Sequence, residues 1–212
     1  MIQKRMVFCM HQKNTLKIID FWYLFFTQNP IEMPQKTVFL LLGANLGDRQ
    51  QTILEAKKYI SLQIGINEKE SKLYQTAAWG VENQPFFLNQ VIQILTSLSG
   101  QELLVEIENI EKKLGRKRYQ KWYARTIDID ILYYENQILD DEEEPKTQNK
   151  NLKVPHPFLH QRRFTLVPLA EIAPLFLHPI LQKTNEELLN ACLDKLPVEE
   201  YFHSQPVIKD KC

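Results

Sequence analysis

Residues 125–132 of the chain read Arg-Thr-Ile-Asp-Ile-Asp-Ile-Leu, with apolar and acidic side chains alternating from 127 to 131. Such alternation predicts a β-strand with one buried face, because successive side chains point to opposite sides. The isoleucines would face the core, and Asp128 and Asp130 would share the other face, about 6.6 Å apart along the strand. Two carboxylates at this spacing can converge on a hard cation such as Mg²⁺. An ordinary solvated strand face would show the same alternation.

The segment before this strand is strongly basic. Its cations are Lys112, Lys113, Arg116, Lys117, Arg118, Lys121 and Arg125. Arginine can hold phosphate through two parallel hydrogen bonds, so arginines beside a carboxylate pair favour phosphoryl or pyrophosphoryl transfer. The whole chain has 26 basic and 26 acidic residues. No overall field therefore directs it toward nucleic acid or membrane, and its electropositive character is local.

Length and composition predict one domain with a substantial core, since 44% of the 212 residues are apolar. The three cysteines are widely spaced and have no neighbouring His or Cys at metal-ligand spacing, which favours free thiols in a reducing compartment, with the cytoplasm as the default. His156 and His160 are four residues apart, but Pro157 disfavours a helical zinc pair.

Residues 1–34 are predicted to be an extension preceding a domain at residues 35–205. The apolar run at 18–26 is too short to span a bilayer, and no signal-peptide cleavage site follows it. Three interpretations stay open: a transit peptide, a disordered extension, and a start of translation at Met33.

Hydrophobic periodicity predicts six elements up to and including the Asp128 strand. They are strands at 37–42, 69–78, 87–98 and 127–132 and helices at 48–63 and 99–114. Asp48 is expected to cap the first helix, and Gly115 is expected to end the second. The resulting order is the split βαβ arrangement of ferredoxin-like domains, an α+β fold with an antiparallel sheet and both helices on one face. The other face, which would carry Asp128 and Asp130, is expected to be free.

The C-terminal third is less regular. The acidic run at 140–144 predicts a solvated loop, and Val-Pro-His-Pro at 154–157 predicts a stiff turn. Residues 158–172 are apolar enough to return to the core, although Pro168 is expected to limit any helix there. A last helix is expected at 185–193.

Several short blocks, taken together, resemble one protein family. The first, Gly-Ala-Asn-Leu-Gly at 43–47, lacks the spacing of a phosphate-binding loop and by itself indicates a tight turn. The others are Tyr-Gln-Thr at 74–76, Gln-Pro-Phe-Phe-Leu-Asn at 84–89, Gly-Arg-Lys-Arg at 115–118, the stretch 122–132, Val-Pro-His at 154–156 and Arg-Arg-Phe at 162–164. In this order they resemble the 6-hydroxymethyl-7,8-dihydropterin pyrophosphokinase family from about residue 38 to residue 174.

This resemblance implies a ferredoxin-like core and an activity in folate biosynthesis. Members of the family transfer the β,γ-pyrophosphoryl group of ATP to the hydroxymethyl group of the pterin and release AMP. The resemblance places two Mg²⁺ ions on Asp128 and Asp130 and gives Arg116 and Arg125 catalytic roles on the transferring group. Any downstream folate enzyme that acts as a partner is expected to be a separate chain, acting in trans. Neither nucleic acid nor membrane is expected as a partner.

The resemblance also implies two sets of binding residues. The ATP-binding set is Glu111, Arg118, Trp122, Ile131, His156 and Arg162. The pterin-binding set is Thr76, Ala78, Trp79, Phe87, Asn89 and Phe164. In the second set Phe87 and Phe164 would stack on the pterin and Asn89 would pair with its polar edge. Taken singly, Glu111 reads equally well as an exposed helix charge, and Asn89 as an exposed strand residue.

Two departures from the family pattern keep alternatives open. Tyr123-Ala124 stands where Gly-Pro usually precedes the arginine, and Ala77-Ala78 replaces a usual proline pair. An inactive homologue that serves as a scaffold would accommodate such changes. A ferredoxin-like RNA-binding module is the other alternative, but it would carry aromatic residues where Asp128 and Asp130 stand.

Overall fold

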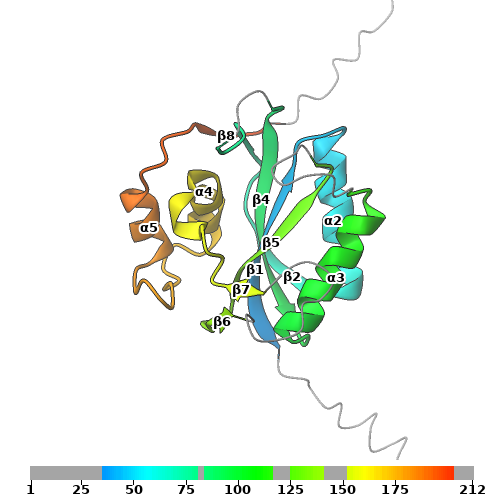
Figure 1. Ribbon diagram of the computed structural model, residues 1–212, viewed down its shortest axis with the longest axis horizontal. Helices are drawn as coiled ribbons and strands as arrows, with labels where there is room; N and C mark the ends of the chain where they lie inside the picture. Colours follow the sequence, from blue (N-terminus) through cyan, green and yellow to red (C-terminus); the bar gives the residue numbers. More distant parts are fainter. Residues whose placement is uncertain (1–34, 81–83, 117–124, 141–151, 203–212) are drawn as a thin grey trace, which may run out of the picture. The chain divides into compact units, whose positions relative to one another are not determined.

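The computed structural model describes residues 35–80, 84–116, 125–140 and 152–202. Its main sheet has the strand order β5-β1-β4-β3-β8, with β2 also paired to β4, and every pairing is antiparallel (Figure 1). The strands are β1 (Lys36–Ala44), β2 (Ile66–Glu70), β3 (Tyr74–Thr76), β4 (Phe87–Thr96), β5 (Asp128–Tyr134), β6 (Leu139–Asp140), β7 (Lys153–Val154) and β8 (Val198–Glu200). The helices are α2 (Arg49–Gln63), α3 (Gly100–Lys113), the short 3-10 helix η1 (Leu159–Gln161), α4 (Arg163–Ile172) and α5 (Asn185–Ala191).

Helices α2 and α3 cover one face of the sheet, as expected from their apolar stripes (Figure 1). Ile127, Ile129 and Ile131 are at most 6% exposed and belong to the core beneath these helices. The predicted division of β5 into an isoleucine face and an aspartate face is therefore confirmed.

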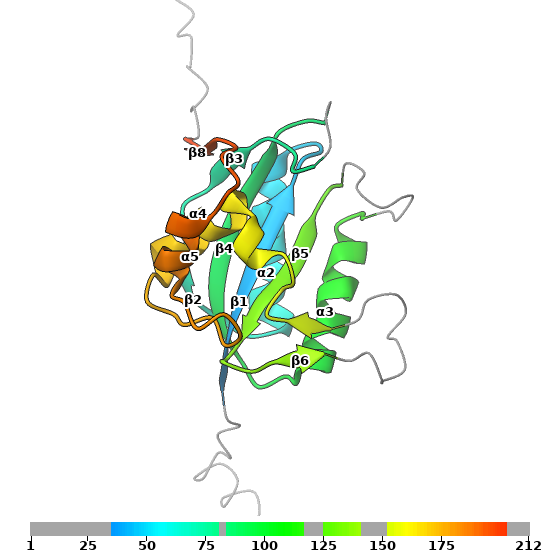
Figure 2. The same ribbon diagram turned by 60° about the vertical axis from the view of Figure 1, so that its left-hand side comes forward.

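The expectation that the other face stays free was wrong, because α4 and α5 pack against part of it (Figure 2). A second core lies there, built around Phe39, Leu41, Val91 and Tyr133. The continuous apolar run of β1 sends side chains to both faces, so both faces need cover. What remains open on this side is the end of the sheet where Asp128 and Asp130 lie.

The caps of the first two helices agree with the sequence patterns. The Asp48 carboxylate accepts a hydrogen bond from the Gln51 amide at 3.0 Å at the start of α2. Ser99 and Glu102 form a capping box at the start of α3. Gly115 follows α3 with a φ of 80°, a conformation that favours glycine. These local signals fix both ends of α3.

Further expectations need correction. The strand predicted at 69–78 is two strands, β2 and β3, because the Ser71 hydroxyl enters the ladder and accepts from the Val91 amide at 3.0 Å. Pro168 lies inside α4 instead of ending it. A proline in the second turn removes one helical hydrogen bond, and the helix continues beyond it to Ile172. Asp140 belongs to β6 and pairs with Lys153 at 3.3 Å, whereas residues 141–144 lie outside the described part.

Helix α5 ends at Ala191, two residues before the predicted end. The proposed extension at 1–34 lies outside the described residues. Within the described part of the chain, no helix has the length and apolarity needed to cross a bilayer.

Candidate active site

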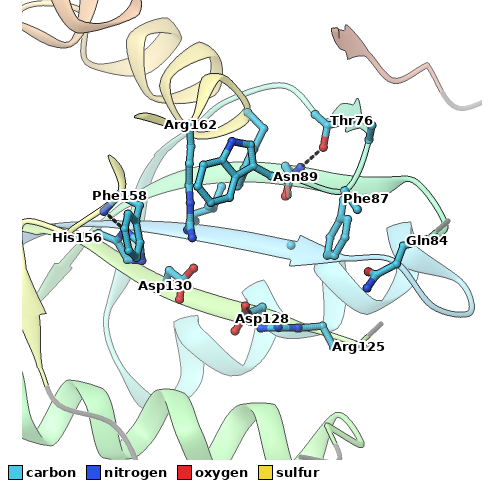
Figure 3. Close-up of a pocket in the computed structure, with 16 residues that line it drawn as sticks. Thr76, Gln84, Phe87, Asn89, Arg125, Asp128, Asp130, His156, Phe158 and Arg162 are labelled. Atoms are coloured by element: carbon cyan, nitrogen blue, oxygen red, sulfur yellow. Dashed lines mark hydrogen bonds and ion pairs between the residues drawn. The ribbon is translucent and has the colours of Figure 1, made fainter. Parts of the chain in front are cut away.

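A pocket of about 380 Å³ opens at the uncovered end of the second sheet face (Figure 3). It brings together predicted residues from β3, β4, β5 and the segment that leads into α4. These are Thr76, Ala78, Trp79, Phe87, Asn89, Arg125, Asp128, Asp130, His156, Arg162 and Phe164. Arg118 and Trp122 lie outside the described residues. Arg116, Glu111 and Ile131 are described but do not line the pocket.

The two aspartates of β5 lie on one side of the pocket (Figure 3). Asp128 forms ion pairs with Arg125 and, at 2.7 Å, with Nη1 of Arg116. Asp130 forms no ion pair with any residue in the described part of the chain. One carboxylate is thus held by two arginines, while the other is available to a cation in the pocket.

Glu111 lies behind this acidic side rather than on the surface. Its side chain is 2% exposed, accepts the Ile129 amide at 2.9 Å and pairs with Arg116. Burial lowers the pKa of Arg116, but the charges of Asp128 and Glu111 outweigh it and the pKa is raised overall. Glu111 is therefore not an exposed helix charge, which was the alternative interpretation of its place in the sequence. It connects α3 to β5 through the Ile129 amide and holds the Arg116 guanidinium beside Asp128.

The opposite side of the pocket is aromatic and amide-bearing. Asn89 is buried on β4, and its Nδ2 donates to the Thr76 hydroxyl at 2.8 Å. Phe87 begins β4 and pairs across the sheet with Thr76. Gly43 of β1 makes room for this arrangement, because a Cβ there would approach Asn89 Oδ1 to 3.0 Å. Asn89 is not the exposed strand residue of the alternative interpretation.

Arg162 extends into the pocket from the start of α4 (Figure 3). Its guanidinium carbon lies 4.9 Å from the ring centre of Trp79, 5.1 Å from that of Phe158 and 5.7 Å from that of Phe164. Burial lowers the pKa of Arg162, and the charge of Asp130 acts in the opposite direction. The aromatic rings hold this cation between the two sides of the pocket.

His156 is oriented by its own backbone and ring. Its amide donates to the Leu132 carbonyl at 3.0 Å, and its Nδ1 accepts from the Phe158 amide at 3.2 Å. This second bond favours the tautomer that carries its proton on Nε2, so the ring can donate a hydrogen bond into the pocket. The Ile131 side chain lies in the core, so its predicted contact with ATP depends on its backbone.

Asn45 is a buried residue beside the pocket that sequence reasoning did not single out. It is 2% exposed, its Oδ1 accepts from the Arg125 amide at 2.8 Å, and its Nδ2 donates to the Gln84 side chain at 3.3 Å. Asn45 therefore connects Arg125 with Gln84, and both of these residues line the pocket. The signal was the asparagine between the glycines at 43 and 47, which the local pattern explained as a turn.

Asn45→Ala is expected to lower kcat about tenfold, because Arg125 loses the bond that positions its backbone. The KM values for the two substrates that the resemblance implies should change less than kcat. Steady-state kinetics checks this expectation, with Asn67→Ala as a control outside the pocket. An unchanged kcat in a folded Asn45→Ala protein would remove Asn45 from the site.

Comparisons with known proteins show what the chain is similar to. The family model of 7,8-dihydro-6-hydroxymethylpterin-pyrophosphokinase (HPPK) matches residues 39–174. The chain is 47% identical over 151 residues to 2-amino-4-hydroxy-6-hydroxymethyldihydropteridine pyrophosphokinase of Aquifex aeolicus, covering 71% of this chain and 89% of the relative. It is 34% identical over 169 residues to the enzyme of the same name from Bacillus subtilis, covering 79% and 96%.

Solved structures resemble this one in fold. The crystal structure of Plasmodium falciparum HPPK-DHPS wild type with pterin and p-hydroxybenzoate aligns with a TM-score of 0.62 at 18% identity. The alignment covers 76% of this chain and 43% of that one.

Proposed function

The chain belongs to the 7,8-dihydro-6-hydroxymethylpterin-pyrophosphokinase family, and from this premise we propose how its pocket divides between the two substrates. The enzyme transfers pyrophosphate from ATP to 6-hydroxymethyl-7,8-dihydropterin in folate biosynthesis. One observation carries the proposal: a carboxylate pair and an amide-aromatic wall face each other across a single pocket. ATP with its metal occupies the Asp128 and Asp130 side, and the pterin occupies the Asn89 side.

The residues present suit magnesium. Asp128 and Asp130 supply two carboxylates from one strand face, and no group of three or more acidic, histidine or cysteine ligands occurs among the described residues. Mg²⁺ characteristically takes one or two carboxylates and completes its shell with water and substrate phosphates. We propose that the pair holds two ions. When bound, magnesium would neutralise phosphate charge and polarise the β-phosphorus.

The chain's own residues position the reactants and stabilise charge. The pterin hydroxyl would attack the β-phosphorus in line, with AMP as the leaving group and no covalent enzyme intermediate. A covalent intermediate would need a nucleophilic side chain. Among the described residues that line the pocket, only Thr76 carries a hydroxyl, and this hydroxyl accepts a hydrogen bond from Asn89. Arg125 and Arg116, now paired with Asp128, would turn toward the phosphates when nucleotide binds.

The remaining proposed contacts divide between the Asp128 and Asp130 side of the pocket, which would take ATP, and the Asn89 side, which would take the pterin. Arg162 and His156 would bind ATP phosphate and ribose or base atoms, together with Arg118, Trp122 and the Ile131 backbone. Glu111, which is buried behind Asp128, would act on ATP only through Arg116. Phe87 and Phe164 would stack on the pterin, with Ala78 and Trp79 beside them. The RNA-binding alternative is disfavoured, since Asp128 and Asp130 would repel a phosphate chain that carries no metal.

We also propose that the core is ferredoxin-like. In its support, the order β5-β1-β4 followed by β2 and β3 corresponds to a split βαβ pair with α2 and α3 on one face. The elements β6 to β8, α4 and α5 would then be additions, and of these the start of α4, with the segment before it, lines the pocket.

Asn89→Ala tests the pterin side. We expect the KM for the pterin to rise about 10- to 100-fold, because a buried amide that reads a polar edge contributes roughly 1–3 kcal/mol. The KM for ATP should stay nearly unchanged. Pterin-dependent release of AMP from ATP is the assay, and Gln93→Ala on the same strand is the control, since Gln93 bonds Glu68 at the surface. An unchanged pterin KM would contradict the assignment.

A further inference from the structure

Arg49, the first residue of α2, connects β3 with the start of β4. These two strands carry Thr76, Phe87 and Asn89, which form the proposed pterin wall of the pocket. Nη1 of Arg49 donates to the Phe86 carbonyl at 2.8 Å, and its Nη2 donates to the Gln75 side chain at 3.2 Å. Gln75 and Phe86 directly precede Thr76 and Phe87, which pair across β3 and β4 and line the pocket. One guanidinium thus fixes the place where both strands enter the pocket.

The other side of Arg49 is also held. Its guanidinium carbon lies 5.9 Å from the ring centre of Tyr201, and the Tyr201 amide donates to the Leu73 carbonyl at 2.8 Å. Tyr201 follows β8, which pairs with β3. The C-terminal strand therefore backs the arginine against β3 and the start of β4.

We propose that Arg49 is a positioning residue for the pterin. It does not line the pocket and acts through its neighbours, by fixing Phe87 relative to Thr76 and hence to Asn89. Only arginine offers two donors in a rigid fork that can reach two separate acceptors. The inference rests on the proposed function, because it assumes that Phe87 and Asn89 contact the pterin.

Steady-state kinetics of Arg49→Met and Arg49→Lys tests the proposal. With Met, the KM for the pterin at saturating MgATP should rise about tenfold, because both bonds are lost. The KM for ATP and kcat should change by no more than about twofold, since the acidic side is untouched. Lys keeps the charge but cannot form both bonds, so its pterin KM should lie between those of the wild type and Arg49→Met.

Lys57→Met is the matched control, because it removes a cation from the same helix and breaks a 2.8 Å pair with Glu70 away from the pocket. It should leave both KM values unchanged. A pterin KM for Arg49→Met within about twofold of wild type, or an equal rise in both KM values, would overturn the proposal. If Arg49→Met does not fold, a wild-type pterin KM for Arg49→Lys would overturn it.

The Asn89→Ala protein separates this inference from the one beneath it. If Asn89→Ala raises the pterin KM and Arg49→Met does not, Arg49 has no positioning role and the pterin wall stands. If neither raises it, the pterin wall itself is wrongly assigned.

Discussion

Asp130→Ala is expected to lower kcat about a thousandfold while the fold stays intact. The substitution removes half of the carboxylate pair that faces the pocket. Loss of metal-based charge stabilisation amounts to several kcal/mol, and each ~1.4 kcal/mol is a factor of ten in rate. Asp130 forms no ion pair with the described residues, so Tm should stay within about 2 °C of the wild-type value. Pterin-dependent AMP release and thermal unfolding measure the two effects.

Asp140→Ala provides the control for this experiment. Asp140 is also an acid at the edge of a strand, but it pairs with Lys153 and does not line the pocket. Its removal should leave kcat unchanged. An Asp130→Ala enzyme with more than about a tenth of wild-type kcat would contradict the metal assignment.

Glu111→Ala is expected to lower the free energy of unfolding by about 3 kcal/mol. The buried carboxylate accepts the Ile129 amide and pairs with Arg116. Without it, a buried amide has lost its acceptor and the partly buried guanidinium has lost one of its two carboxylates. Glu111→Gln should cost less, since the amide oxygen can still accept from Ile129. Urea unfolding of both proteins measures the difference, provided that the m-value is unchanged.

Glu106→Ala on the same helix is the matched control, because Glu106 is only partly buried. It should change the free energy of unfolding by no more than about 0.5 kcal/mol. A loss of less than about 1 kcal/mol for Glu111→Ala would show that Glu111 is not the support of β5 described above.

The parts of the fold that the sequence predicted are those with local causes. The alternation in β5 places Asp128 and Asp130 on one face whatever the rest of the chain does, and the capping residues of α2 and α3 act within one turn. The cover of the second face depended on packing between distant segments. Pro168 was expected to limit any helix at 158–172, although the apolar side of α4 and the need to cover β1 favoured one.

The parts of the site that sequence reasoning missed depend on contacts between distant residues. Asn45 binds Arg125 across 80 positions, and Arg49 binds Phe86 across 37. Glu111 was identified, but its burial against β5 depends on how α3 packs on the sheet. Local pattern carries no information on such pairs, because an asparagine in a turn and an arginine at a helix start are each satisfied by solvent.

A crystal structure with Mg²⁺, a non-hydrolysable ATP analogue and the pterin tests the central claim most directly. We expect Asp128 and Asp130 both to bind magnesium on the nucleotide phosphates, Asp128 to be released from at least one arginine, and the pterin to lie between Phe87 and Phe164. A nucleotide bound in the pocket while Asp128 stays paired with both arginines and Asp130 contacts no ion would contradict the account.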